Sequence, residues 1–367
     1  MNKYIQEYIA LTMIEGVGSM TIQYLLSYCG GIENIFRSSK AKLMKIPNIG
    51  AITADAILSK DPMDRAEEEL QFIEKNQIQT YFHTDENYPH RLKECKDHPL
   101  LMFYKGNSPI ENKKVLAIVG TRNATEYSQR FLDTLLEELS TIPELLVVSG
   151  LAYGVDIKSH RACIKNKIPN IAVMGTGLNS IYPATHRKYA VEIVQNGGLL
   201  TEFTTRSKIV PANFPMRNRI IAGLSDVTLV VETKTKGGSV ITANIANSYN
   251  REVVALPGKV GEETSEGCNF LIKTYKAQMV ESAADLLNYM DWGNTLKKKK
   301  AVQREFNFEG NDQEKKVYEI IQNNRGIEID KLCYLSELTG SAIAGILLEM
   351  ELNNIVRPLP GKKYELI

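Results

Sequence analysis

Cysteine is scarce in this 367-residue chain, and no two cysteines form a CxxC pair. The five that occur are widely separated and odd in number: Cys29, Cys95, Cys163, Cys268 and Cys333. A disulfide framework needs an even set, and a structural zinc site usually needs closely spaced pairs. The sequence therefore predicts free thiols, no disulfide scaffold and no metal site.

Long apolar runs are also missing. No segment approaches the ~18 apolar residues that span a bilayer. The first residues, 1–7, do not show a basic segment followed by an apolar one, as a secretory signal would. We therefore expect a cytoplasmic protein that has no membrane partner.

Several catalytic and cofactor motifs are missing as well. There is no GxxxxGK[ST] phosphate loop, no GxGxxG dinucleotide fingerprint and no GxSxG nucleophile turn. No close pair of carboxylates suggests general acid–base chemistry. A relay of Ser149, His160 and Asp156 is conceivable, but structural pairing of Asp156 with His160 at i, i+4 is the simpler interpretation. We expect no catalytic residues and no cofactor.

The net charge, +1, does not by itself indicate a nucleic-acid partner. Its distribution is uneven, because residues 1–80 and residues 311–367 each carry −2, whereas the middle of the chain carries +5. A polyanion would therefore prefer the middle.

The length suggests two or three domains, and the residue patterns divide the chain into four segments. We expect a helical domain over 1–62, an extended Rossmann-like domain over 63–290, a linker over 291–312 and a small domain over 313–367. The linker contains four consecutive lysines at 297–300, which either contact DNA or are simply solvated.

The helical domain contains two similar turns, at 14–22 and 46–54. Each places an apolar residue and a glycine before a new apolar-periodic helix, a pattern typical of SAM-like helix-hairpin-helix turns. The N–H groups at such helix starts can meet a phosphate. The region is net acidic, however, and a tight interhelical turn without DNA contact explains the pattern equally well.

From residue 115 onward, short β-branched apolar runs alternate with helical segments. This alternation predicts an α/β fold with a parallel sheet covered on both faces. The preceding histidines, His83, His90 and His98, are expected in loops and not as metal ligands. The expected strands are 115–119, 145–148, 171–174, 198–203, 227–231 and 253–256, and the helices between them include 126–140, 155–167 and 239–250.

The last segment shows three helical patterns, at 314–323, 329–336 and 340–353, followed by a hairpin pattern. This order predicts a winged helix, a domain that often reads DNA through its third helix. The third helix here carries no Lys or Arg. A protein contact is therefore at least as good a prediction as major-groove binding.

Small residues follow nearly every predicted strand, in loops that begin at 120, 149, 175, 201, 235 and 257. Parallel strands present their carboxyl ends at one edge of the sheet, which is where open α/β sheets bind ligands. Small residues there allow backbone N–H groups to approach a phosphate. The sequence therefore predicts a phosphate or nucleotide site at this edge.

Side chains near this edge fit a nucleic acid. Arg122 directly follows the first strand, and the segment 206–219 contains four cations, one aromatic ring and two asparagines. Cations pair with phosphates, and a ring can stack on an unpaired base. The candidate contacts in that segment are Lys208, Phe214, Arg217, Asn218 and Arg219. Alternatively, Phe214 belongs to the core and Arg217 or Arg219 makes an internal ion pair.

In this region the sequence resembles the DNA-processing protein A family. The matching segments are 119–122, 149–156 with His160, 175–178 with Tyr182-Pro183, 214–224, 237–243 and 256–258. Their order and spacing agree over roughly residues 80–285, and the run FPMRNRIIAGL over 214–224 is the most specific part.

The resemblance implies an extended Rossmann domain that binds single-stranded DNA, forms homodimers and delivers incoming strands to a RecA-type recombinase during natural transformation. It also implies a C-terminal winged helix. It assigns DNA contacts to Arg122, Phe214, Gly238 and Ser239. Some members carry a lysine where this chain has Pro211, and Lys208 is the candidate replacement.

Two other functions fit the same features. Nucleotide phosphoribohydrolases share the architecture, but segment 236–243 lacks the glutamate of their PGGxGTxxE signature. A protein-interaction scaffold that uses the two acidic end domains is the other alternative. A DNA-binding protein without turnover fits best, and we expect replacement of Arg122 or Arg217 by alanine to weaken binding with little loss of fold.

Overall fold

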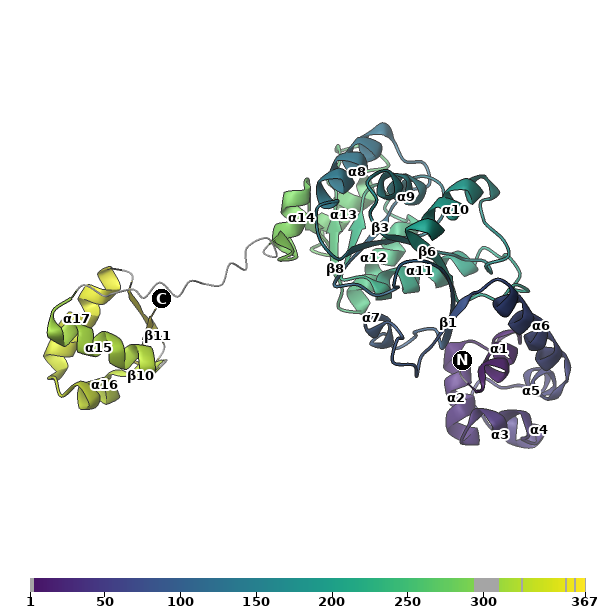
Figure 1. Cartoon of the computed structure of the whole chain (residues 1–367), viewed down its shortest axis with the longest axis horizontal. Helices are drawn as coiled ribbons and strands as arrows, with labels where there is room; N and C mark the ends of the chain where they lie inside the picture. The colour runs from purple at the N-terminus through teal and green to yellow at the C-terminus, as the bar shows by residue number, and fades with distance from the viewer. Residues whose placement is uncertain (1–2, 294–309, 325, 354, 360, 367) are drawn as a thin grey trace. The chain divides into compact units, whose positions relative to one another are not determined.

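The computed structural model describes residues 3–293 and 310–366, except 325, 354 and 360. The chain divides into two compact units, Met1–Thr295 and Leu296–Ile367. Most of the predicted linker, including its lysine run, lies outside the described residues. The first unit contains a helical domain joined to a large sheet (Figure 1).

The helical domain contains the two predicted turns, each of which ends in a glycine that caps the next helix. Gly18 precedes α2 and Gly50 precedes α5, both with extended backbone. The predicted domain boundary at 62/63 falls inside α6. Ala66 and Ile73 of that helix are buried in the same core as α1, so α6 packs as part of the helical domain. The helices are α1 Ile5–Thr12, α2 Ser19–Cys29, α3 Ile32–Phe36, α4 Lys40–Leu43, α5 Ala51–Leu58 and α6 Asp61–Lys75.

The sheet has nine strands in the order β1-β2-β6-β5-β4-β3-β7-β8-β9. The six predicted parallel strands are confirmed to within two residues at each end. The pairings of β1 with β2 and of β2 with β6 are antiparallel. The strands are β1 Gln79–Phe82, β2 Leu101–Gly106, β3 Lys114–Val119, β4 Leu145–Ser149, β5 Asn170–Val173, β6 Gly197–Thr201, β7 Val227–Val230, β8 Glu252–Ala255 and β9 Gln278–Met279.

Three strands near the two edges of the sheet, β1, β2 and β9, were not expected, because the sequence analysis predicted no strand of this sheet before residue 115 or after residue 256. They are short, and β1 finds its partner about twenty residues away, so only the tertiary pairing defines them. Their side chains alternate between two cores: Phe82 and Phe103 pack against the helical domain, whereas Tyr81 and Tyr104 pack beneath the opposite face. The antiparallel edge therefore joins the helical domain to the sheet.

Helices cover both faces of the sheet, as predicted (Figure 1). Alternate residues of β3 divide between the faces: Ala117 packs with α11 and α12, and Leu116 packs with α8, α9 and α14. The helices are α7 His90–Lys93, α8 Glu126–Leu139, α9 Val155–Lys165, the 3₁₀ turn η1 Ala184–His186, α10 Arg187–Gln195, α11 Asn213–Leu224, α12 Gly238–Ser248, α13 Glu266–Lys273 and α14 Ala283–Tyr289.

The second unit contains the three predicted helices and the hairpin, and its three strands are ordered β10-β12-β11. A capping box between Asn311 and Glu314 starts the first helix. Within the described residues no single helix is long and apolar enough to cross a membrane; α16 and α17 reach that length only together, with a bend of 110° between them. The elements are α15 Asp312–Asn323, β10 Ile327–Glu328, α16 Ile329–Ser336, α17 Gly340–Leu352, β11 Val356–Leu359 and β12 Lys363–Leu366.

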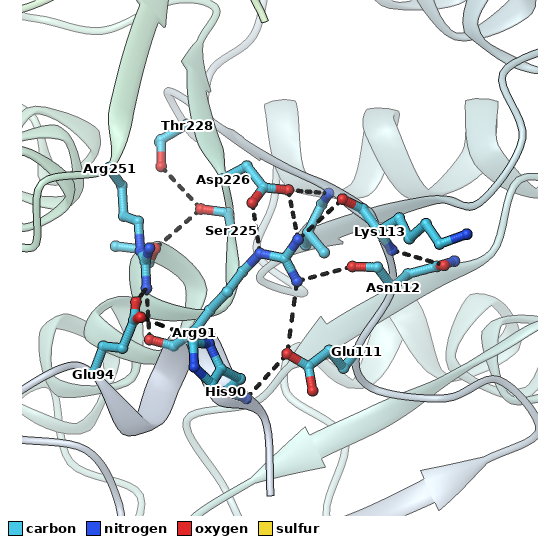
Figure 2. A network of polar contacts seen from close by, with 12 residues as sticks. His90, Arg91, Glu94, Glu111, Asn112, Lys113, Ser225, Asp226, Thr228 and Arg251 are labelled. Atoms are coloured by element: carbon cyan, nitrogen blue, oxygen red, sulfur yellow. Dashed lines mark hydrogen bonds and ion pairs between the residues drawn. The ribbon is translucent and has the colours of Figure 1, made fainter. Parts of the chain in front are cut away.

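A partly buried arginine secures the amino end of the sheet (Figure 2). Arg91 of α7 donates two hydrogen bonds to Asp226, from Nε to Oδ1 at 2.6 Å and from Nη2 to Oδ2 at 3.0 Å. Its remaining N–H groups donate to the carbonyls of Asn112 at 2.8 Å and Lys113 at 3.1 Å. Asp226 also accepts from the Val115 amide of β3 at 2.7 Å. One side chain therefore connects α7, the start of β3 and the start of β7.

We expect Arg91→Ala to lower the free energy of unfolding by about 2 to 3 kcal/mol, because the partly buried Asp226 would lose its counter-charge and the carbonyls of Asn112 and Lys113 would lose their donor. Lys113→Ala is the control, since it removes only the exposed ion pair with Glu144 and should cost about 0.5 kcal/mol or less. Urea unfolding can be followed through the fluorescence of Trp292, the single tryptophan, which lies in the core of this unit. Equal losses of unfolding free energy in Arg91→Ala and Lys113→Ala would contradict the stabilising role assigned to Arg91.

Candidate nucleic-acid interface

A cleft of about 340 Å³ opens at the carboxyl edge of the sheet, where the sequence predicts a phosphate site. It lies where the chain passes from β3 into α8, from β4 into α9, and from β7 into α12, with α11 along its side. Six of the eight predicted contacts line it, namely Arg122, Phe214, Arg217, Asn218, Gly238 and Ser239. The fold therefore brings together residues that are up to 117 positions apart in the sequence.

Two glycines shape the wall of the cleft below Arg122. Gly154 has φ of +76°, and a Cβ there would lie 2.1 Å from the carbonyl oxygen of Thr121. A Cβ on Gly120 would lie 2.4 Å from Val155. Larger residues would push the loop after β3 away from the start of α9, so these glycines set the position of Arg122.

The start of α12 offers the clearest ligand-binding group in the cleft. Ser239 is 6% exposed, yet its Oγ has no hydrogen-bond partner among the residues that the structure describes. A Cβ added to the neighbouring Gly238 would meet open space, so the glycine leaves the backbone N–H groups of the helix start accessible. Buried hydroxyls normally have partners, and this one lies at the positive end of a helix dipole, which favours an anion.

An arginine and an aromatic ring lie elsewhere on the lining. The Arg122 guanidinium is exposed, and its carbon lies 5.9 Å from the centroid of the Phe214 ring. Phe214 is half-buried, and its ring covers Gly175, where a Cβ would lie 2.9 Å from Cδ1. The ring of Tyr182, 50% exposed, has its centroid 5.4 Å away. Phe214 therefore lies at the cleft surface next to a second ring that the sequence placed in a motif but gave no role.

Arg217 is buried at the base of the cleft, 4% exposed, and does not project into solvent. Its guanidinium donates to the Val173 carbonyl, and its Nε donates to Asn218 Oδ1 at 3.1 Å. Asp156 is adjacent, since a Cβ on Gly150 would lie within 2.7 Å of both side chains. Burial raises the pKa of the Asp156 carboxyl, and the adjacent guanidinium opposes that rise. Removing Arg217 would leave Asp156 buried without this guanidinium, so the structure leads us to expect that Arg217→Ala costs stability as well as affinity.

Arg219 and Lys208 do not line the cleft. Arg219 donates from Nη2 to Glu202 Oε2 at 2.5 Å, and both side chains are 12% exposed. This is the internal ion pair that the sequence left open as an alternative. Lys208 lies exposed in the loop before α11, where its carbonyl accepts from Asn213 Nδ2 at 2.8 Å.

Ser149, His160 and Asp156 do not form a catalytic relay, because the first two have other hydrogen-bond partners. Ser149 Oγ donates to the Ile118 carbonyl at 2.6 Å. The His160 ring nitrogens face the Gly150 carbonyl at 2.6 Å and Asn170 Oδ1 at 2.8 Å. In the described part of the chain, no group of three or more His, Cys, Asp or Glu side chains is placed to hold a metal ion.

A larger cavity of about 540 Å³ lies beside the neighbouring strand ends. Its lining includes three carboxylates, those of Glu232, Glu262 and Glu281, and a single cation, Lys259. Glu232 accepts from the amide and hydroxyl of Thr125 at 2.9 and 2.6 Å. The excess of negative charge disfavours phosphate, so the smaller cleft is the better polyanion site despite its size.

Comparison with known proteins finds relatives that cover most of the first unit. Residues 79–291 match the family model described as DNA recombination-mediator protein A, and residues 8–60 match a SAM-like helix-hairpin-helix tandem. The chain is 32% identical over 287 residues to Protein Smf of Synechocystis, covering 76% of this chain and 71% of that protein. It is 37% identical over 203 residues to the DNA processing protein DprA of Streptococcus pneumoniae, covering 55% and 71%.

Two solved structures are also similar. The X-ray structure of DNA processing protein A from Streptococcus pneumoniae aligns with a TM-score of 0.62 at 28% identity, over 78% of this chain and 98% of that one. A structure of the Helicobacter pylori protein, described as revealing its single-stranded DNA binding mode, aligns with a TM-score of 0.53 at 31% identity, over 58% and 95%. The family-model match covers more than half of the sequence, and this chain therefore belongs to the DNA recombination-mediator protein A family.

Proposed function

We propose that this chain binds single-stranded DNA in the cleft at the carboxyl edge of the sheet and catalyses no reaction there. The observation that carries the proposal is the start of α12, where the buried Ser239 hydroxyl lacks a partner within the described part of the chain and Gly238 leaves the backbone accessible. Phosphate oxygens would accept hydrogen bonds from both. Arg122 supplies an exposed cation on the same lining.

The preference for a single strand follows from Phe214. Its ring, next to Tyr182 at the cleft surface, would stack on an unpaired base. A duplex keeps its bases stacked on one another, so the same ring could engage it only after a base is splayed out. The Helicobacter pylori relative, described as binding single-stranded DNA, supports this choice.

The buried arginines have a different part in the proposal. Arg217 places a positive charge beneath the bound strand, and Asn218 lies beside it on the lining. Arg219 holds α11 against Glu202 without reaching the cleft. Lys208 contacts a phosphate from the loop that leads into α11.

Three further properties are proposed on the basis of the family. The protein acts as a homodimer, works in the cytoplasm and passes the strand to a RecA-type recombinase during natural transformation. The second unit is interpreted as a winged helix. We assign it a protein contact, because α17 carries no Lys or Arg and exposes Leu348 and Leu352 by 59% and 75%.

Binding should be tighter for labelled oligo-dT than for a duplex of the same length, and it should weaken steeply with salt. If about three phosphates are neutralised, affinity should fall roughly 20-fold between about 50 and 200 mM salt. Fluorescence anisotropy measures both quantities. A flat salt response or equal binding of the two DNAs would contradict the electrostatic and stacking arguments, and no binding to either would favour the nucleotide-enzyme alternative.

Arg122→Ala should weaken oligo-dT binding about tenfold, since one charge-assisted phosphate contact is lost. The slope of log affinity against log salt should also become shallower by roughly 0.7. Arg130→Ala is the matched control, because Arg130 is exposed on α8 and pairs only with Glu126 one turn away. Wild-type affinity in Arg122→Ala would remove this residue from the interface.

Ser239→Ala should weaken binding about threefold to tenfold without lowering the melting temperature, because the hydroxyl contributes a hydrogen bond only when DNA is present. Ser248→Ala provides the comparison in the same helix, where the hydroxyl donates to the Ile245 carbonyl at 2.7 Å, away from the cleft. That variant should bind DNA normally. A drop in melting temperature for Ser239→Ala with unchanged binding would show that the hydroxyl has a structural role instead.

A further inference from the structure

The loop between β6 and α11, residues 202–212, presents Lys208 and leads directly into Phe214. Its middle is exposed: Ile209 and Val210 are 48% and 39% accessible. A loop of this length pays a substantial entropy cost if it must be ordered when DNA binds. What fixes its backbone beforehand therefore affects affinity.

The principal anchor comes from the helical domain. Glu69 of α6 is 4% exposed, and its two carboxylate oxygens each accept from the Thr205 amide at 3.0 Å. The Thr205 hydroxyl also donates to Oε2 of the same carboxylate. Burial raises the pKa of Glu69, and the bonds from Thr205 oppose that rise. A buried carboxylate that accepts both donors of one loop residue is a strong and specific contact.

Two asparagines complete the anchorage. Asn179 Nδ2 donates to the Thr205 carbonyl at 3.0 Å, so both backbone groups of Thr205 are bonded. Asn213 Nδ2 donates to the carbonyls of Lys208 at 2.8 Å and Gly175 at 3.2 Å. Since the Phe214 ring covers Gly175, the backbone of Lys208 is tied through one side chain to the wall of the cleft.

The residue next to Glu69 makes a very different contact with the same loop. Glu68 pairs with Arg206, but the two side chains are 58% and 52% exposed. Exposed pairs of this kind contribute little, because water and salt screen them. The chain thus offers two adjacent glutamates that contact adjacent loop residues, one buried and one exposed.

We propose that Glu69 is a positioning residue for DNA binding, through which the helical domain fixes the loop that carries Lys208. This inference rests on the proposed function, since it concerns the same cleft. The helical domain then contributes to affinity without itself touching the strand. Its contribution passes from the α6 carboxylate through Thr205 to Lys208 and Phe214.

The test uses the full chain with Glu69→Ala, Glu69→Gln and the control Glu68→Ala. Oligo-dT affinity should fall about fivefold to tenfold in Glu69→Ala and less in Glu69→Gln, which keeps one acceptor oxygen. Glu68→Ala should stay within about twofold of wild type. Trypsin should cut after Arg206 and Lys208 faster in Glu69→Ala than in Glu68→Ala, because the loop backbone is released.

A double-mutant cycle separates positioning from a general loss of structure. If Glu69 acts through the loop, Lys208→Ala should weaken binding in the wild-type background and have a much smaller effect in Glu69→Ala. Additive losses would overturn the inference, as would wild-type affinity in Glu69→Ala. If Glu69→Ala does not fold, Thr205→Val removes the hydroxyl donor alone, and unchanged affinity and trypsin cleavage in that variant would overturn the inference.

The two proposals fail in distinguishable ways. If the wild-type protein does not bind oligo-dT, both the proposed function and the positioning role of Glu69 are contradicted. Wild-type protein that binds, with Glu69 variants that bind equally well, leaves the function intact and removes only the positioning role.

Discussion

The interface depends on the parallel pairing of β3 with β4 on one side and with β7 on the other. The chain proceeds outward from β3 through β4, β5 and β6 and then returns to add β7 on the opposite side. All these strands present their carboxyl ends at the same edge, and the crevice at such a switch point collects loops from distant parts of the sequence. Arg122, Phe214 and Ser239 can share a cleft only because of this topology. At the amino ends of β3 and β7, the Arg91–Asp226 pair connects the two strands (Figure 2).

Charge at the candidate site is divided between an exposed cation on its lining and cations held by internal contacts. Arg122 is exposed and adaptable, whereas Arg217 is buried beside Asp156 and contacts the Val173 carbonyl. Burial restricts Arg217 to the base of the candidate cleft, whereas the exposed Arg122 lies on its lining. Arg219 lies two positions further along α11 and is neutralised by Glu202. Three cations near one cleft therefore differ in mobility, solvation and partner.

The helical domain is structurally continuous with the sheet and is not a separate appendage. Phe82 and Phe103 of the antiparallel edge lie in its core, and Glu69 of its last helix accepts hydrogen bonds from the loop before α11. Mixed sheets often place antiparallel strands at an edge. Here that edge provides the surface on which the helical domain packs. This packing brings α6 within hydrogen-bonding distance of the loop before α11.

Much of this protein follows from its sequence alone. The β-branched runs specify six parallel strands, because strands buried on both faces need continuous apolar residues. The small residues after those strands locate the site, and the run FPMRNRIIAGL identifies the family. Tertiary structure decided the rest. Arg217, Asn218 and Arg219 are consecutive, yet a helix turns successive side chains by about 100°. Only packing therefore decides which of them line the cleft. The short strands β1 and β2 and the bond from Thr205 to Glu69 join residues 19 to 136 positions apart, and no local pattern encodes such pairings.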